Sequence, residues 1–276
     1  ISSAVAGAAT APFAAAHFNQ ISHYGLIANL VMPAAVLAAC LAPFGLAGAG
    51  LWLMGLGLRW ILFVANTVAG WDGALSHVKS PGPWVLPCLT LGLLWLILWQ
   101  GRARLAGTIG IAAALVLWIQ TPRPAVLIAD SGGLVGAMGP DGRALSTATG
   151  DGFVAGIWLE NDGGPVPQDV AANRRGLIPA PRGATVQMGQ HNITLVRGKT
   201  ALAQMQGCGG ADILISNQTD AGPRPCLVLD VAALRKTGAI ALDLDDAGRL
   251  IVTTASQITG RRPWVETAPV IIAPLE

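Results

Sequence analysis

The sequence predicts a multi-domain membrane protein, with an α-helical transmembrane region followed by a small soluble α+β domain that is rich in strands. Residues 1–120 carry four basic residues and one acid, whereas residues 121–276 carry thirteen basic and fourteen acidic residues. Seven of the nine Trp also lie in the first part. Long apolar runs then give way to short β-like runs bounded by turn residues. We place the domains at residues 1–121 and 122–276.

The first domain begins with apolar runs that proline and small residues interrupt. Residues 1–16 are rich in Ala and Gly and predict the end of a membrane helix, and residues 17–24 predict a polar connection. Residues 25–48 are long enough to cross a bilayer, but Pro33 and Pro43 would kink or split them, so a spanning and a re-entrant helix both stay open. The chain opens inside an apolar run with no basic region before it, so we expect a truncated membrane domain and no signal peptide.

Residues 51–69 predict a further spanning helix that carries a charge near its middle. Arg59 lies seven residues after Trp52 and seven before Asn66, so the three share one helical face. An Arg at mid-depth costs roughly 2.5–3.5 kcal/mol even on the mildest scales. Arg59 therefore faces a protein or water interior, or the segment lies flat at the membrane surface as an amphipathic helix.

Two apolar runs, residues 84–99 and 105–119, predict a helical hairpin. Trp residues lie near the run ends, as interfacial anchors do. Arg102 and Arg104 lie in the tight loop between the runs, and positive charge favours the cytoplasmic side. The second helix would then leave the cytoplasm. We expect a multi-pass protein of the cytoplasmic (inner) membrane whose C-terminal domain is periplasmic.

Residues 122–276 predict a compact α+β domain. Eight short runs are typical of strands: residues 125–129, 134–138, 184–188, 193–196, 213–216, 227–229, 240–244 and 250–254. Two turn sequences, Pro140-Asp141-Gly142 and Asp245-Asp246-Ala247-Gly248, predict hairpins. Short helices are expected at residues 153–159, 200–206 and 231–237.

Cys208 and Cys226 are the two cysteines of this domain. They can form a disulfide in an oxidising compartment, and two unrelated thiols are the alternative. With His191 they would offer three zinc ligands. No C-x-x-C spacing supports a zinc site, so we expect a surface His and a structural cysteine pair.

The region around residues 11–43 resembles a known family. The residues that carry the resemblance are Phe13, His17, Phe18, Ile21, Gly25, Leu26, Ile27, Ala28, Asn29, Leu30, Val31 and Pro33. Their order and spacing are similar to the polytopic membrane segment of the ComEC-type competence family. The ending Gly260-Arg261-Arg262-Pro263-Trp264 resembles family members with a shortened C-terminal domain. The resemblance implies a channel that carries single-stranded DNA across the cytoplasmic membrane during natural transformation.

Under this resemblance, polar residues near membrane depth are candidates for a DNA path. The candidates are His17, Asn19, His23, Asn29, Arg59 and Asn66. For each except Arg59, a helix–helix hydrogen bond or solvation in a loop is the stronger alternative. The expected partners are single-stranded DNA, membrane lipid, other competence proteins (a DNA receptor and a cytoplasmic helicase or translocase) and further copies of the chain in a homo-oligomer. The sequence has no nucleotide-binding loop, so other components would supply the work of pulling DNA inward.

Many members of this family end in a metallo-β-lactamase-like domain, which residues 211–218 and 236–252 resemble. That chemistry needs a dense His and Asp cluster to hold two metals. Asn217 and Gln218 stand where histidines would be expected, and His191 is the only His after residue 77. We therefore predict a degenerate domain with no metal, no cofactor and no catalytic residue, and a protein that is not an enzyme. The alternative is a membrane-anchored metal-dependent hydrolase or nuclease acting through this domain.

Overall fold

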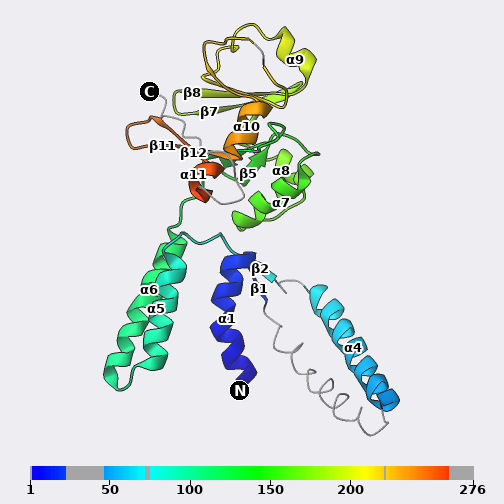
Figure 1. Ribbon diagram of the computed structural model, residues 1–276, viewed down its shortest axis with the longest axis vertical. Coiled ribbons are helices and arrows are strands. Elements are labelled where there is room, and N and C mark those ends of the chain that lie inside the picture. Colours follow the sequence, from blue (N-terminus) through cyan, green and yellow to red (C-terminus); the bar gives the residue numbers. More distant parts are fainter. Residues whose placement is uncertain (1, 23–46, 72–74, 221, 261–276) are drawn as a thin grey trace. The chain divides into compact units, whose positions relative to one another are not determined.

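The computed structural model describes residues 2–22, 47–71, 75–220 and 222–260. The chain divides into two compact units, Ile1–Thr121 and Pro122–Glu276, whose elements are coloured along the sequence in Figure 1. The prolines that would break residues 25–48 lie outside the described residues, as do two candidate path residues, His23 and Asn29.

The first unit begins with apolar helices and a short pair of strands. Helix α1 spans Ser2–Phe18 and helix α4 spans Ala47–Ala69. Strand β1 (Gln20–Ser22) pairs antiparallel with β2 (Leu75–His77). The sequence predicts only a polar connection at residues 17–24, and the structure corrects this by placing strand β1 within it. Strands of three residues are too short to show a two-residue alternation.

The predicted helical hairpin is confirmed. Helix α5 spans Val85–Leu98, a short 3₁₀ turn η3 spans Arg102–Leu105, and α6 spans Ala106–Ile119. The two helices approach so closely that a Cβ atom added at Gly92 would lie 2.8 Å from the carbonyl oxygen of Gly107. A Cβ at Gly107 would lie 2.5 Å from the carbonyl oxygen of Gly92. Glycine is therefore required on both sides of this contact.

The second unit alternates short strands and short helices, as its sequence predicts. Its strands are β3 (Val126–Ile128), β4 (Val135–Gly139), β5 (Gly142–Leu145), β6 (Ile178–Ala180), β7 (Gly183–Met188), β8 (His191–Val196), β9 (Ile213–Ser216), β10 (Leu227–Leu229), β11 (Ile240–Leu244) and β12 (Leu250–Thr254). Its helices are α7 (Gly152–Asn161), α8 (Gln168–Ala172), α9 (Lys199–Gln204), α10 (Val231–Thr237) and α11 (Ala255–Thr259).

Among the described residues of this unit, the strands form two five-stranded sheets, with the orders β10-β9-β8-β7-β6 and β12-β11-β3-β4-β5. The second sheet is antiparallel throughout. In the first sheet β9 runs parallel to both β8 and β10. All four residues of β9 are buried, which fits a central parallel strand covered on both faces. The expected α+β class is confirmed for this unit.

The two sheets pack face to face over one apolar core. Ile193, Ile213 and Ile215 of the first sheet meet Ile128 and Leu242 of the second. On its other face, the antiparallel sheet packs against α7 and α8. The parallel-containing sheet packs against α9 on its own outer face. The layers are thus helix, sheet, sheet and helix, which can be followed from α9 to α7 and α8 in Figure 1.

Candidate functional site

The candidate path residues of helix α4 lie on its surface. Arg59 and Asn66 are both exposed, and so is Trp52, at 70% of its full area. Arg59 forms no hydrogen bond or ion pair with any residue that the structure describes. Because the three residues repeat every seven positions, they keep the common helical face that their spacing predicts. This face of a mostly apolar helix therefore carries a cation that is unpaired among the described residues.

His17 and Asn19 lie at the end of α1 and have different environments. His17 is exposed in the last helical turn. Asn19 is buried and adopts a positive φ of 54°. Its Oδ1 accepts a hydrogen bond from the Ser80 hydroxyl at 2.8 Å, and its carbonyl oxygen accepts one from the Val78 amide at 2.9 Å. Asn19 therefore links the end of α1 to the segment after β2 by hydrogen bonds. This is a structural role, the alternative to a place on the DNA path.

The structure does not join the candidates into one polar site. Within the described ranges, no hydrogen bond or ion pair connects His17 with Arg59 or Asn66. Arg59 and Asn66 are brought together only by sharing α4. The path through His17, His23, Asn29, Arg59 and Asn66 stays a prediction.

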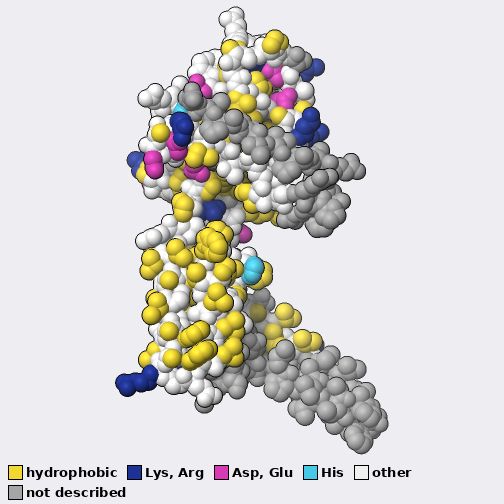
Figure 2. Space-filling model, turned by 60° about the vertical axis from the view of Figure 1, so that its left-hand side comes forward, with side chains coloured by type: hydrophobic (Ala, Val, Ile, Leu, Met, Phe, Trp, Pro, Cys, Tyr) yellow, Lys and Arg dark blue, Asp and Glu magenta, His cyan; other side chains and the backbone are white. Residues whose placement is uncertain are grey.

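The α5–α6 hairpin is apolar on nearly its whole outer surface. Only its inner face is buried, at Val85, Leu89 and Ala114, whereas Leu98, Ile109 and Ile119 are each more than 70% exposed. Figure 2 shows hydrophobic side chains over the visible face of this hairpin and basic ones at its tip. A helix that is hydrophobic all round belongs in a protein core or a membrane.

Trp side chains fix both ends of the hairpin. At the tip, the Trp95 indole N–H donates to the carbonyl of Ala103 at 3.0 Å and its ring stacks on Trp99 at 4.3 Å between centroids. At the base, the Trp118 indole donates to the carbonyl of Lys79 at 2.7 Å. Trp rings with one polar contact are typical of the two membrane interfaces.

One helical segment in the described part of the chain, Arg102–Ile119, is long and apolar enough to cross a membrane. Val85–Leu98 is apolar but shorter. The expectation of several spanning helices stays a prediction.

The family match agrees with this apolar unit. Residues 1–103 match the family model described as Competence protein. This match supports a ComEC-type competence protein. The match supports a role in DNA uptake during competence and an association with the membrane. No curated protein and no solved structure matches the chain.

The α+β unit has amide side chains where the metallo-β-lactamase resemblance expects histidines. Asn217 and Gln218 follow strand β9 directly. The Asn217 Oδ1 accepts a hydrogen bond from the Gly198 amide at 2.9 Å, and the Gln218 side chain donates to the Asn217 carbonyl at 3.0 Å. Both amide side chains thus form hydrogen bonds with nearby backbone groups. Among the described residues, no group of three or more His, Cys, Asp and Glu is placed to hold a metal ion.

A tight loop packs against the same end of β9. Gly132 has a φ of +63°, and a Cβ atom there would lie 2.3 Å from the Ser216 carbonyl oxygen. The Ser131 hydroxyl donates to Asp151 at 3.0 Å and accepts from the Gly133 amide at 3.0 Å. The Ser131 and Asp151 side chains therefore shape the loop and are already engaged with each other.

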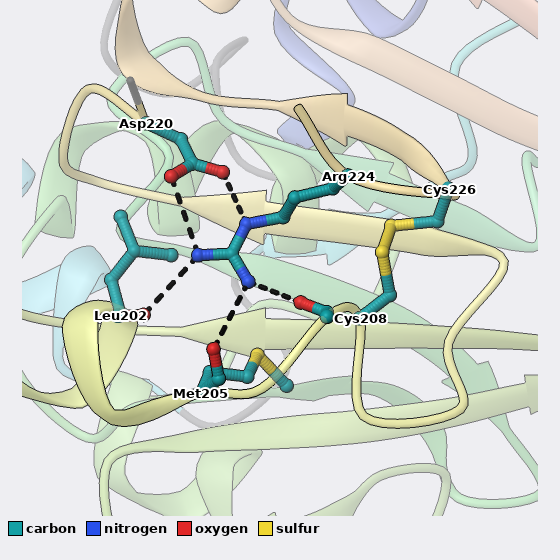
Figure 3. The surroundings of a disulfide bond; sticks show 7 residues. Leu202, Met205, Cys208, Asp220, Arg224 and Cys226 are labelled. Carbon is teal, nitrogen blue, oxygen red and sulfur yellow. Dashed lines mark hydrogen bonds and ion pairs between the residues drawn. A yellow bond between two sulfur atoms is a disulfide. The ribbon is translucent and has the colours of Figure 1, made fainter. Parts of the chain in front are cut away.

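Cys208 and Cys226 are joined by a disulfide, one of the two alternatives that the sequence leaves open. Beside this bond, Arg224 makes an ion pair with Asp220 and donates to the carbonyls of Leu202, Met205 and Gly207 (Figure 3). A cationic side chain at the C-terminal end of α9 satisfies carbonyls that the helix leaves free. The hydrogen bond from Arg224 is the main cause that lowers the pKa of Asp220 below its ordinary value.

Arg143 forms a second polar centre that sequence reasoning missed. Its side chain is fully buried and donates to both oxygens of Asp162, at 2.5 and 3.3 Å, and to the carbonyls of Gly136 and Pro124. Asp162 also accepts from Arg123 at 2.8 Å. Nothing in the local pattern around Arg143 distinguishes it from a surface cation, because its partner follows nineteen residues later.

His191 links the ends of both sheets. Its Nε2 lies 3.3 Å from the Gly248 carbonyl oxygen, and its Nδ1 lies 4.0 Å from Asp212. The side chain is mostly buried, so the expected surface His is wrong. Cys208 and Cys226 are bonded to each other, so neither thiol is available to bind zinc together with His191.

Proposed function

We propose that the chain is part of a membrane channel that translocates single-stranded DNA across the cytoplasmic membrane during natural transformation. The competence family match supports this proposal. The observation that carries it is Arg59, an exposed cation midway along an apolar helix of 23 residues, unpaired among the described residues. A cation at that depth is costly against lipid, and a wet path for a polyanion removes the cost.

The proposed channel is multi-pass, and its α+β unit lies in the periplasm. The apolar outer surface of the α5–α6 hairpin supports membrane insertion. Arg102 and Arg104 at its tip support a cytoplasmic loop. A disulfide is typical of an oxidising compartment, and the Cys208–Cys226 bond therefore supports a periplasmic α+β unit.

We further propose that this chain is a conduit without catalytic activity. Other competence proteins, a DNA receptor and a cytoplasmic helicase or translocase, would deliver and pull the strand, and copies of the chain would associate in the membrane. The α+β unit has the helix–sheet–sheet–helix layering that a degenerate metallo-β-lactamase-like domain requires. Its Asn217 and Gln218 bond to nearby backbone groups, which favours a metal-free version.

The channel proposal is tested by transformation with added DNA in cells whose outer-membrane uptake step is intact. We expect deletion of the gene to abolish transformation while labelled DNA still enters the periplasm. Arg59→Gln should lower transformation about tenfold, since one charge that faces the strand is lost, and Arg59→Lys should retain most of it. Arg104→Gln, at the hairpin tip, is the matched control. Unchanged transformation after deletion would refute the proposal.

The hydrolase alternative is separated by metal analysis of the purified full chain together with nuclease and phosphodiesterase assays. Stoichiometric zinc or manganese with turnover would replace the conduit by an enzyme. We expect neither, because the described residues offer no cluster of metal ligands.

A further inference from the structure

The register of the parallel-containing sheet brings together basic residues that are separate in the sequence. Arg182 lies directly before β7, and Arg197 lies directly after β8. The Arg197 amide donates to the Arg182 carbonyl at 2.7 Å, which extends the β7–β8 ladder by one pair. The two arginines therefore stand opposite each other on neighbouring strands. Lys199, the first residue of α9, follows two positions later.

These three residues lie at the end of the sheet where β7 begins and β8 ends, and we call them the edge cations. They have no acidic partner among the described residues. Arg182 and Lys199 are exposed and Arg197 is half-buried. None of them forms an ion pair or a side-chain hydrogen bond with a described residue. Like charges on opposite positions of two strands repel each other. An unrelieved cluster of this kind is stabilised when an anion binds.

The residue after strand β9 adds a neutral hydrogen-bond donor at the same end of the sheet. The β8–β9 register pairs Val196 with Ser216, so the next pair is Arg197 with Asn217. The Asn217 oxygen already accepts from Gly198, whereas its NH₂ group donates to no described residue. Asp220, three residues further on, is neutralised by Arg224. The edge thus offers several donors, and the acid that follows it in the chain is already engaged.

We propose that the edge cations form a docking surface for the phosphate backbone of single-stranded DNA, with Asn217 as an added donor. The inference rests on the proposed function, because the role in DNA uptake makes this strand the polyanion at hand. Three cations bind a strand weakly, and the affinity should fall with salt with a log–log slope of about −2. Weak binding suits a surface that guides a moving strand and then releases it.

The test uses the full chain in nanodiscs of neutral phosphatidylcholine and a fluorescent thirty-nucleotide oligothymidine. Wild type should bind at low salt with the stated slope. The triple variant Arg182→Gln, Arg197→Gln, Lys199→Gln should bind about tenfold more weakly with a slope near zero. The matched control, Arg235→Gln, Lys236→Gln, Arg249→Gln, changes the net charge equally and should bind within about twofold of wild type.

Several outcomes would overturn the inference. Wild type that does not bind the oligonucleotide, or an equal loss in both triple variants, removes the docking surface. A triple variant that keeps oligonucleotide binding but no longer captures phosphatidylglycerol vesicles assigns the edge cations to lipid. The transformation assay tests the channel proposal separately, because transformation that does not need the gene refutes the channel. Normal DNA binding by the triple variant of the edge cations refutes only the docking surface.

Discussion

Arg143 and Arg224 each tie several separate backbone segments of the α+β unit together. Arg143 joins the entry segment at Pro124, strand β4 and the residue after α7. Arg224 joins the end of α9 to the disulfide-bonded loops. A guanidinium suits both places, because it is always charged and presents five donors in a fixed plane.

Asp162→Asn should strongly destabilise the α+β unit. The Arg143 side chain is fully buried, and without the carboxylate its charge stays uncompensated, at a cost of about 3–5 kcal/mol. The midpoint of urea unfolding of the full chain in detergent, followed by near-UV circular dichroism, measures the effect. Asp141→Asn breaks the exposed pair with Arg175 and should leave the midpoint nearly unchanged. Equal shifts in the two variants would contradict this assignment.

The pair between Asp220 and Arg224 predicts a pH dependence of stability. The pKa of Asp220 is lower in the folded chain than its ordinary value, with the Arg224 hydrogen bond as the main cause. Its stabilisation is therefore complete above about pH 4 and is lost as the pH falls through the folded pKa. Asp220→Asn should have a lower urea midpoint than wild type at pH 5, and the gap should narrow as the pH falls below the ordinary pKa of Asp. A gap independent of pH would argue against this.

At the scale of elements, the α5–α6 hairpin depends on the absence of side chains at its crossing. Gly107→Ala places a methyl group against the Gly92 carbonyl, so the helices must separate, at a cost of about 1–3 kcal/mol. Trypsin cleavage at Arg102 and Arg104 in reconstituted protein should become faster. Gly55→Ala on α4 meets no atom within 4 Å and serves as control. Unchanged cleavage of the Gly107 variant would show that the crossing tolerates the methyl group.

The elements that could be predicted have strong local patterns. The eight expected strands are all present, because apolar β-branched runs between turn residues mark them. Strand β6 was missed because it is an exposed three-residue edge that contains Pro179. Strand β5, Gly142–Leu145, was missed because Gly and Arg begin it, and the buried Arg143 is explained only by distant Asp162.

The candidate site was less predictable than the fold. Helical spacing places Arg59 and Asn66 on one exposed face, which a sequence can show. The pairing of β7 with β8 brings Arg182 beside Arg197. The two residues are fifteen positions apart, so the local sequence around either one does not show that they are neighbours. The sequence also makes Asn19 a candidate path residue, but its hydrogen-bond partner Ser80 lies 61 residues further along the chain, which no local pattern reveals.

At the scale of the whole molecule, the proposed topology assigns each end of the α5–α6 hairpin to one side of the membrane. A fusion of alkaline phosphatase after Gly260 should be active, because this enzyme needs an oxidising compartment. A fluorescent protein that folds only in the cytoplasm should stay dark at the same position and should fluoresce when fused after Gly101, at the hairpin tip. The reverse pattern would invert the topology.

The disulfide has a consequence for how newly made copies mature. Under the proposed topology, a copy inserted in the opposite orientation would leave Cys208 and Cys226 in the reducing cytoplasm, where the disulfide between their loops cannot form. Such a copy would keep two free thiols, and the loops beside α9 would lack their covalent link. Only correctly oriented copies would therefore carry the disulfide, which distinguishes them chemically from inverted ones.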